Sequence, residues 1–333
     1  MIEKNISLKK YNTFSVETKA SELFECTNIP SLIKFLKEHK TEQKILILGQ
    51  GSNMLFVNDF EGTIIVMKTK GISIFEKTEH QIILKVSAGE IWDEFVSFCV
   101  ENNYGGVENL SNIPGTVGAS SVQNIGAYGV EAKDVISKVE VLNISNQEIE
   151  IFSVEDCKFG YRESVFKNEF KDKYIVLNVY FKLSTNPVFK LDYGTIKKEL
   201  ENLEINLKTI RQAIIKIRSE KLPEPKELPN AGSFFKNPIV SNFIFLELQR
   251  KFPDLIGYSL ENNLTKLAAA QLIEKCGWKG RSEGNVGVHK NQSLVIVNYG
   301  NATGIEIYNF SKKIQKSVFE NFGLELEREA LVV

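Results

Sequence analysis

Hydrophobic and polar positions follow two different periods along the first third of the chain. Apolar residues recur at helical spacing in residues 31–37 and 91–101, which predicts two helices. Short, nearly continuous apolar runs at 45–48, 63–67 and 82–86 predict buried strands. We therefore expect a region in which helices and strands are mixed.

The pattern changes between residues 105 and 129, where Gly, Asn, Ser and Pro replace the apolar runs. A structureless segment of this length inside a compact domain is uncommon unless it is functional, so we expect an ordered loop whose backbone is used for binding. Strand-type alternation returns at 139–151 and 174–183. We place a domain edge at 204–206.

Helical periods dominate the rest of the chain. The pattern predicts an amphipathic helix at 208–218, an Ala-rich helix at 265–276 and a long amphipathic helix at 305–322. A strand is expected at 293–298. The length suggests two or three domains.

The composition excludes several classes of protein. The 333 residues include 41 Lys plus Arg and 42 Asp plus Glu, which gives a formal net charge of −1. This balance provides no general attraction to nucleic acid or to anionic lipid, and no local basic patch is visible. No apolar run approaches the ~18 residues of a membrane span, and the first residues lack the apolar core of a signal peptide. We expect no nucleic-acid partner, no membrane association and a cytoplasmic protein.

Cysteine and histidine usage narrows the chemistry further. The four cysteines are far apart and form no C-x-x-C pair, so we expect reduced, mostly buried thiols. The three histidines make both a histidine-rich metal site and a hydrolytic triad difficult to build. No metal site is expected.

A glycine-rich turn follows the strand predicted at 45–48. Gly49 and Gly51 allow backbone N–H groups to approach an anion, and Ser52 and Asn53 add side-chain donors. The turn is not a Rossmann fingerprint, because Met54 stands where the third glycine would be and a strand is expected to follow. Phosphate binding and a simple tight turn both remain open for this segment.

A second glycine-rich segment extends from Asn112 to Gly129. Its glycines, hydroxyls and amides form a chain of donors that can wrap a pyrophosphate and hydrogen-bond a heterocycle. The alternative is a long surface loop, but its length favours function. The candidate binding residues here are Pro114, Gly115, Gly118, Gln123, Asn124, Gly126 and Ala127.

Tyr161 and Arg162 offer an aromatic ring beside a planar cation suited to a carboxylate or phosphate, although a lone arginine is more often a solvated surface charge. Ser233 follows a glycine, and no nucleophile elbow surrounds it, so a hydrolase nucleophile is disfavoured while a proton donor or a cap stays open.

Near the C-terminal end, alternation places Glu325, Glu327 and Glu329 on one side of a predicted strand. Such carboxylates are usually solvated. If this side faces a pocket, repulsion and burial raise the pKa of one of them and make it a candidate acid.

In their order and spacing these segments resemble the MurB family, the UDP-N-acetylenolpyruvoylglucosamine reductases of bacterial peptidoglycan synthesis. The resemblance covers nearly the whole chain. It is carried by Tyr11-Asn12-Thr13-Phe14, Gly49 to Asn53, Pro114 to Gly118, Gln123 to Gly129, Gly160 to Arg162, Lys221-Leu222-Pro223, Ala231 to Asn237 and the glutamate-rich segment.

The resemblance implies an α+β fold with a two-domain FAD-binding module of the vanillyl-alcohol-oxidase (PCMH) type and a C-terminal α+β substrate-binding domain. Residues 1–66, completed by 323–333, would form the first FAD-binding subdomain, residues 67–206 the second, and residues 207–322 the substrate-binding domain. Non-covalent FAD is expected, because neither glycine-rich segment contains a histidine that could tether the flavin. A monomer is expected.

The family also implies a reaction. NADPH as co-substrate reduces FAD, and the flavin then reduces UDP-N-acetylglucosamine enolpyruvate to UDP-N-acetylmuramate. Negative charge develops at the carbon that bears the carboxylate, and stabilising it is the main catalytic demand. By resemblance Arg162 pairs with the carboxylate, Ser233 donates a proton to carbon, and Glu329 assists as an acid or electrostatic partner.

Substrate contacts are implied in the same way. Tyr161 is a ligand contact, and Leu191-Asp192-Tyr193-Gly194 resembles the loop that places a tyrosine over the substrate in type I members of the family. Lys221, Asn237 and Gln292 match positions that contact the nucleotide diphosphate or its surroundings.

Two departures from the family pattern matter. Arg328 stands where the family has a proline between two glutamates, which leaves Glu327 as an alternative to Glu329. Ser121 stands where relatives usually have proline, which reduces the rigidity of the loop.

Two other functions stay open. A related FAD-dependent oxidoreductase with another substrate would bind flavin without needing Tyr193, Ser233 and Lys221. A non-catalytic flavin-binding or sugar-nucleotide-binding module would tolerate the loss of Arg162, Ser233 and Glu329.

Overall fold

The computed structural model describes residues 2–39, 44–193 and 195–333. The chain forms two compact units, each assembled from segments that are distant in sequence. Unit 1 contains Met1–Ile6, Ala20–Gln50 and Glu61–Arg218, and unit 2 contains Ser7–Lys19, Gly51–Phe60 and Ser219–Val333. Over the described ranges, every helix is too short or too polar to cross a membrane.

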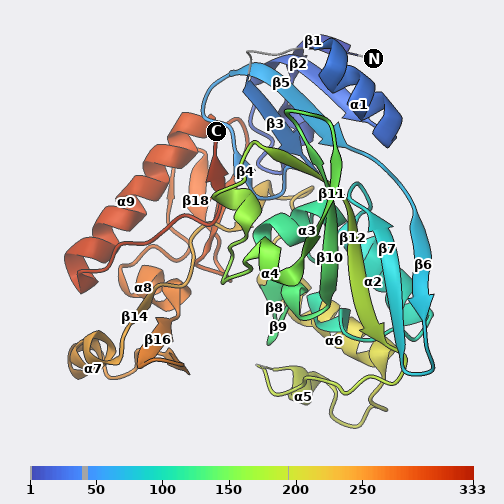
Figure 1. Cartoon of the computed structure of the whole chain (residues 1–333). Helices are drawn as coiled ribbons and strands as arrows, with labels where there is room; N and C mark the ends of the chain where they lie inside the picture. Colours follow the sequence, from blue (N-terminus) through green and yellow to red (C-terminus); the bar gives the residue numbers. More distant parts are fainter. Residues whose placement is uncertain (1, 40–43, 194) are drawn as a thin grey trace. The chain divides into compact units, whose positions relative to one another are not determined.

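A four-stranded sheet with one covering helix begins unit 1 (Figure 1). The strand order is β1-β2-β5-β3, and β3 runs parallel to β5. The helix α1 (Ile29–Glu38) starts where the Asn28 side chain accepts a hydrogen bond from the Ser31 N–H, and its Phe35 ring stacks on Phe24 of β2. The strands are β1 (Ile2–Ser7), β2 (Lys19–Cys26), β3 (Lys44–Leu48) and β5 (Phe60–Met67).

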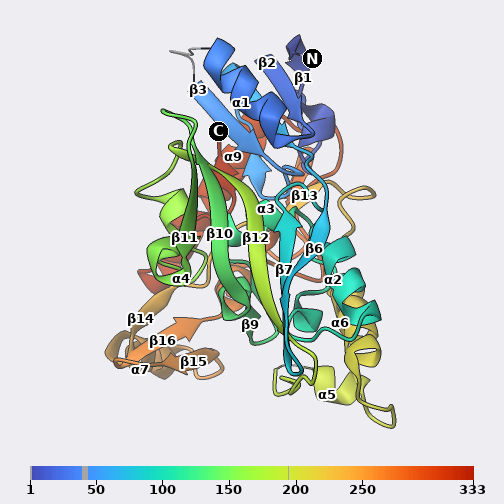
Figure 2. The same cartoon turned by 45° about the vertical axis from the view of Figure 1, so that its right-hand side comes forward.

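The second sheet of unit 1 has five antiparallel strands in the order β11-β10-β12-β7-β6. Its core face is built from alternate positions of β12, and the Phe181 ring lies 4.6 Å from that of Phe95 on α2 (Trp92–Glu101). Figure 2 shows α6 (Leu207–Lys221) beside α2, where Arg211 forms two hydrogen bonds with Asp93. The strands are β6 (Ile72–Lys77), β7 (Gln81–Ser87), β10 (Ile136–Asn143), β11 (Ile149–Ser153) and β12 (Tyr174–Ser184).

The segment predicted as a continuous loop at 105–129 contains a helix, so that prediction is wrong in part. The helix α3 (Val117–Gln123) is capped by Thr116, whose side chain accepts from the Ala119 N–H. Around it are η2 (Glu108–Leu110), β8 (Gly126–Ala127), β9 (Val130–Glu131) and η3 (Ala132–Asp134). Unit 1 also contains α4 (Val154–Cys157), η4 (Val165–Lys167) and α5 (Ile196–Glu199).

Unit 2 contains one four-stranded sheet, one three-stranded sheet and a parallel pair, with strand orders β13-β19-β18-β17, β14-β16-β15 and β20-β4. The long helix α9 (Gly304–Phe322) starts with a capping box between Thr303 and Glu306 and buries Ile307 and Ile314 in the core of the unit. The other elements are η1 (Lys9–Tyr11), β4 (Met54–Leu55), β13 (Asn230–Ser233), β14 (Ile239–Ser241), α7 (Asn242–Lys251), β15 (Gly257–Leu260), β16 (Leu264–Leu267), α8 (Ala269–Lys275), β17 (Ser282–Glu283), β18 (Val286–Val288), β19 (Val295–Asn298) and β20 (Leu331–Val332).

Two predictions in this part of the chain need correction. The helix predicted at 265–276 begins only at Ala269, because residues 264–267 form β16 and pair with both β14 and β15. The predicted C-terminal strand is extended, and its Leu324 and Leu326 are buried as alternation requires, but ladder pairing is limited to the bridge at Arg328 and to β20. The three-domain division proposed from the sequence stays a prediction.

The cysteine prediction is confirmed where burial is concerned. All four thiols are free, and Cys26, Cys99 and Cys157 are buried. Burial raises the pKa of Cys26 to about 11, despite a hydrogen bond to the Asn28 backbone that lowers it. This thiol is therefore protonated and unreactive near neutral pH.

Candidate functional site

In unit 1 the first glycine-rich turn lies against the second glycine-rich segment. The Gln50 side chain accepts a hydrogen bond of 2.8 Å from the Gly115 N–H. A Cβ atom on Gly49 would lie 2.5 Å from the Thr116 Oγ1, a distance that real Cβ atoms do not show. Glycine at position 49 therefore permits the close approach of the two segments.

The start of α3 is held by acceptors within unit 1. The Val117 N–H donates to the Glu90 carbonyl and the Gly118 N–H to the Ala88 carbonyl, both at 2.9 Å. The next N–H, that of Ala119, binds the Thr116 cap. These amides, together with that of Gly115, fix the shape of the segment. Pro114 is exposed beside them, and Gln123 is half-buried at the other end of α3.

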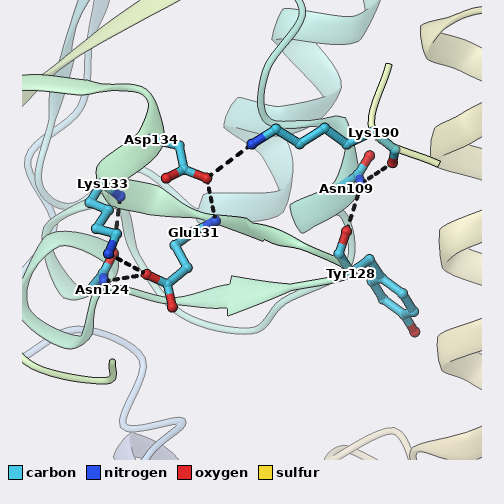
Figure 3. A network of polar contacts seen from close by, with 7 residues as sticks. All are labelled: Asn109, Asn124, Tyr128, Glu131, Lys133, Asp134 and Lys190. Carbon is cyan, nitrogen blue, oxygen red and sulfur yellow. Dashed lines mark hydrogen bonds and ion pairs between the residues drawn. The ribbon is translucent and has the colours of Figure 1, made fainter. Parts of the chain in front are cut away.

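Asn124 connects this segment to Tyr161 and Arg162. It ends α3 in the left-handed conformation, and its side chain donates to the Gly160 carbonyl at 2.7 Å and to Glu131 at 3.1 Å. The contact with Glu131 is drawn in Figure 3. The structure therefore brings the predicted cofactor residue Asn124 next to the turn that carries the predicted arginine.

Arg162 is fixed from two directions. Its guanidinium donates to the Gly126 carbonyl at 2.6 Å and lies 5.4 Å from the centre of the Tyr161 ring. Its backbone has a φ of 57°, and the Lys167 ammonium donates to its carbonyl at 2.7 Å. A non-glycine residue in this conformation is uncommon and strained, and such strain clusters at functional sites.

Tyr193 lies on the same unit and is 47% exposed. Its ring contacts that of Tyr128 edge to face, with centroids 6.0 Å apart. Burial raises the pKa of Tyr128, against the opposing effect of the positive charge of the nearby Arg218 guanidinium. Gly194, which belongs to the same sequence motif, lies outside the described residues.

The residues Gly51, Ser52 and Asn53 belong to unit 2. A Cβ on Gly51 would lie 2.0 Å from the Tyr11 carbonyl oxygen, and its φ is +64°, so only glycine fits this position. The Asn53 side chain donates to the Glu329 carbonyl at 3.1 Å, and the Asn53 carbonyl accepts from the Leu331 N–H at 2.9 Å. Asn53 thus holds the segment that contains the predicted acidic residue.

The segment 324–333 also lies along the residues that follow Ser233. The Glu329 N–H donates to the Phe234 carbonyl at 2.9 Å, and the Lys236 N–H donates to the Glu327 carbonyl at 2.9 Å. Glu329 is therefore opposite the immediate neighbour of Ser233, whereas Glu327 is two residues further along.

The side chains of the two glutamates have different surroundings. The Glu327 side chain is 69% exposed and forms an ion pair of 2.6 Å with Lys236. Glu329 is half-buried. Of the two carboxylates that the sequence left open, Glu329 is both nearer to Ser233 in register and less solvated.

Arg328, the departure from the family's proline, anchors this segment to α9. It donates to the Ser311 hydroxyl at 3.1 Å and to the Gln315 side chain at 2.6 Å, and it lies 4.6 Å from the centre of the Tyr308 ring. The sequence contained no signal for this role, because the partners Ser311 and Gln315 lie on α9, 17 and 13 positions before Arg328.

The remaining predicted substrate residues also belong to unit 2. Asn237 accepts from the Ala269 N–H at 3.0 Å and so supports the start of α8. The Gln292 side chain accepts from the Leu294 N–H at 3.2 Å. Lys221 is exposed at the end of α6. Their roles toward a ligand stay predictions.

Sequence reasoning missed Asn109, Tyr128 and Arg218, which adjoin the predicted site residues of unit 1. Arg218 hydrogen-bonds Tyr128 and donates to the Asn112 carbonyl at 3.1 Å. One signal was present: Arg211 and Arg218 are seven residues apart and lie on one face of α6, next to apolar positions. Asn109 had no comparable signal.

Comparisons with known proteins match both parts of the chain. The family model described as UDP-N-acetylenolpyruvoylglucosamine reductase, C-terminal domain, matches residues 224–333, and the FAD binding domain model matches residues 21–152. These matches confirm the expected FAD-binding module followed by a separate C-terminal domain.

Full-length relatives and a solved structure agree. The UDP-N-acetylenolpyruvoylglucosamine reductase of Flavobacterium johnsoniae is 47% identical, over 100% of this chain and 99% of the relative. That of Bacteroides fragilis is 42% identical, over 98% and 99%. The crystal structure of the MurB enzyme of Thermus caldophilus has a TM-score of 0.71 at 23% identity and covers 100% of this chain and 98% of that chain, which confirms the α+β fold.

Proposed function

The chain belongs to the UDP-N-acetylenolpyruvoylglucosamine reductase family, and on that premise we propose that it reduces UDP-N-acetylglucosamine enolpyruvate to UDP-N-acetylmuramate with NADPH and FAD. This is a step of bacterial peptidoglycan biosynthesis. The observation that carries the proposal is the 47% identity over the whole chain.

The residues of the glycine-rich segments suit FAD. Residues 49–53 and 112–127 contain no charged side chain. Neither segment therefore has a negative side chain that would repel a diphosphate or a positive one that would neutralise it. Small residues such as Gly49 let backbone segments approach closely, and Ser52 and Gln123 add neutral polar groups. We assign FAD to these segments through Gly49, Gly51, Ser52, Asn53, Pro114, Gly115, Gly118, Gln123, Asn124, Gly126 and Ala127.

FAD, when bound, would supply the hydride chemistry between NADPH and the vinyl carbon of the substrate. The chain's own task is to stabilise the charge that this transfer leaves on the substrate. Arg162 suits that task, because its fork is already held by the Gly126 carbonyl and its left-handed backbone is held by Lys167. We assign it to the substrate carboxylate.

Ser233 then donates its proton to the carbon that bears the carboxylate. A neutral serine is a weak acid, so the step depends on the basicity of the enolate and on a fixed orientation of the hydroxyl. The register of Glu329 with Phe234 supports Glu329, rather than Glu327, as the carboxylate that assists Ser233. Tyr161, Tyr193, Lys221, Asn237 and Gln292 are assigned to the substrate.

The test is the Ser233→Ala variant, followed in two half-reactions. We expect NADPH to bleach the flavin at the normal rate, and reoxidation by the UDP-sugar substrate to slow by about 10²–10⁴-fold, the usual contribution of a general acid. Near-normal reoxidation would remove the proton-donor assignment. If the purified protein neither contains nor takes up FAD, both proposed enzyme functions are excluded. If it oxidises NADPH only with another acceptor, a related oxidoreductase is favoured.

We also propose a cytoplasmic monomer. Light scattering on the purified protein, with and without substrate, tests the oligomeric state directly. A stable dimer would contradict the proposal.

A further inference from the structure

Asn109 lies in η2, and its side chain joins two backbone segments of unit 1. Its Nδ2 group donates to the Tyr128 carbonyl at 3.0 Å and to the Lys190 carbonyl at 2.8 Å (Figure 3). Only 1% of the residue is exposed. Because both acceptors are carbonyls, the orientation of the amide is fixed, with its two N–H groups toward them.

The Asn109 Oδ1 is buried and accepts no hydrogen bond within the part of the chain that the structure describes. Burying an unsatisfied acceptor lowers stability, and a leucine of similar size would avoid that penalty. The contribution that is specific to asparagine at this position is therefore the pair of donations to Tyr128 and Lys190.

These two carbonyls belong to the two segments whose tyrosine rings are in contact. Tyr128 follows β8, which contains Gly126 and Ala127, and Lys190 precedes Tyr193 by three residues. The rings of Tyr128 and Tyr193 meet edge to face at 6.0 Å. The buried Asn109 side chain thus connects the backbone at Tyr128, next to the proposed FAD-binding segment, with the backbone that leads to the exposed Tyr193.

A second connection between the same regions is weaker. The Lys190 ammonium lies 3.4 Å from Asp134, and both side chains are partly solvated, at 60% and 33% exposure. Surface ion pairs of this kind contribute little. Phe189 and Leu191 pack their side chains against buried apolar residues on either side of Lys190, and the Asn109 amide adds a buried hydrogen bond to the Lys190 backbone itself.

We propose that Asn109 is a positioning residue for Tyr193, which it holds over the substrate by tying the backbone at Lys190 to the turn at Tyr128. The inference rests on the proposed role of Tyr193 in binding the UDP-sugar substrate. Asn109 acts through the loop and does not itself touch the substrate. It therefore affects substrate affinity and leaves the transfer of electrons from NADPH to the flavin unchanged.

The first test does not depend on activity. In the Asn109→Leu variant of the FAD-loaded protein, we expect backbone amides in residues 186–193 to exchange hydrogen at least tenfold faster, as measured by mass spectrometry. Amides of the central strand β12 serve as an internal reference. The control is Lys190→Ala, which removes the Asp134 ion pair but keeps the Lys190 carbonyl, and there we expect unchanged exchange. Equal exchange in Asn109→Leu and wild type would overturn the inference.

The second test links Asn109 to Tyr193. We expect Asn109→Leu to raise KM for the UDP-sugar about tenfold with less than a twofold change in kcat, and to add nothing in a Tyr193→Ala background. Fully additive effects would overturn the positioning role. If Tyr193→Ala alone leaves KM unchanged, this contradicts both the proposed role of Tyr193 and the inference about Asn109. If Tyr193→Ala raises KM and Asn109→Leu does not, only the inference about Asn109 is contradicted, and the proposed role of Tyr193 is kept.

The smaller variant Asn109→Ser provides the same test if Asn109→Leu does not fold. It removes the Nδ2 donors without adding apolar bulk, and we expect the same rise in KM and in loop exchange. A folded Asn109→Ser protein with normal KM would overturn the inference even if Asn109→Leu cannot be purified.

Discussion

The contacts that hold the candidate site residues span different distances along the chain in the two units. In unit 1 the glycine-rich segments and the arginine turn are held by backbone groups and neutral amides, as in the bonds of Gln50 to Gly115 and of Asn124 to Gly160. In unit 2 the candidate acid is held by a partner 276 positions away, Asn53. On the assignments proposed above, unit 1 contributes Arg162 and most of the FAD-binding residues, whereas unit 2 contributes Ser233 and the carboxylate that assists it.

The largest expected effect is in unit 2. If Glu329 assists Ser233, Glu329→Gln lowers the rate of flavin reoxidation by substrate by about 10²–10³-fold, because the variant keeps the size of the side chain and removes its charge. The affinity for FAD stays within about twofold, since the backbone bonds of residue 329 to Phe234 and Asn53 remain. Stopped-flow absorbance of the flavin measures both half-reactions.

Glu327→Gln is the matched control. The Glu327 carboxylate is mostly solvated and pairs with Lys236, so we expect a change in rate below about threefold. A larger loss in Glu327→Gln than in Glu329→Gln would reverse the assignment of the carboxylate.

An intermediate effect is expected in unit 1. A Cβ at position 49 would force Thr116 away, and overpacking of this kind costs about 1–3 kcal/mol. We therefore predict that Gly49→Ala weakens FAD binding by roughly 5- to 150-fold. At saturating FAD, turnover recovers to near the normal value. Flavin fluorescence titration measures the affinity, and turnover that stays low at saturating FAD would contradict the assignment of Gly49 to FAD binding.

The smallest effect is expected far from the glycine-rich segments, on the second sheet of unit 1. Lys85 pairs with Glu140 at 2.8 Å, and the carboxylate also accepts hydrogen bonds from Asn178 and Tyr180. Burial alone would raise the pKa of Glu140, but these partners lower it overall. Burial alone would likewise lower the pKa of Lys85, but Glu140 and Tyr180 raise it overall.

The sign of the pH dependence follows. The lowered pKa of Glu140 contributes stability above the unfolded-state value near 4.5, and that contribution is lost as the pH falls through the folded value. The raised pKa of Lys85 contributes below 10.5 and is lost as the pH rises through the folded value. Both contributions are present at neutral pH.

We predict that Lys85→Met lowers the free energy of unfolding by about 1 kcal/mol at pH 7, a value reduced for the partial exposure of Lys85. The difference from wild type shrinks as the pH falls from about 4.5 through the lowered folded-state pKa of Glu140, because the carboxylate that pairs with Lys85 then becomes protonated. Urea denaturation at pH 7 and pH 4 measures it. FAD affinity serves as the control, and a parallel loss would show that the glycine-rich segments depend on the distant sheet.

The elements that the sequence predicted well are those whose own pattern determines them. The helices α1, α2, α6 and α9 and the strands β3, β5, β7, β12 and β19 were expected close to their observed bounds, because the helices have a clear apolar period and the strands are short, mostly apolar segments. The errors occurred where tertiary pairing overrides local preference. Residues 264–267 have helical periodicity with the residues after them, yet they form the central strand of the three-stranded sheet.

The candidate site shows the same limit. The sequence of α3 is poor in helix formers, and the helix depends on the Thr116 cap and on the contact of Gly118 with Ala88, neither of which can be inferred from spacing. Motifs led to Gly49, Arg162, Ser233 and Glu329, and the functional roles of these residues stay predictions. The Asn109 amide was missed, because its two acceptors are backbone carbonyls and any residue type provides those.

The pairing of β20 with β4 has a consequence for biosynthesis. Met54 and Leu55 emerge early from the ribosome, but their partners Leu331 and Val332 are made after every residue of unit 1. At about 5–20 residues per second, unit 1 has several seconds to fold before that pairing becomes available. During this time Met54 and Leu55 lack the strand partners that they have in the complete fold.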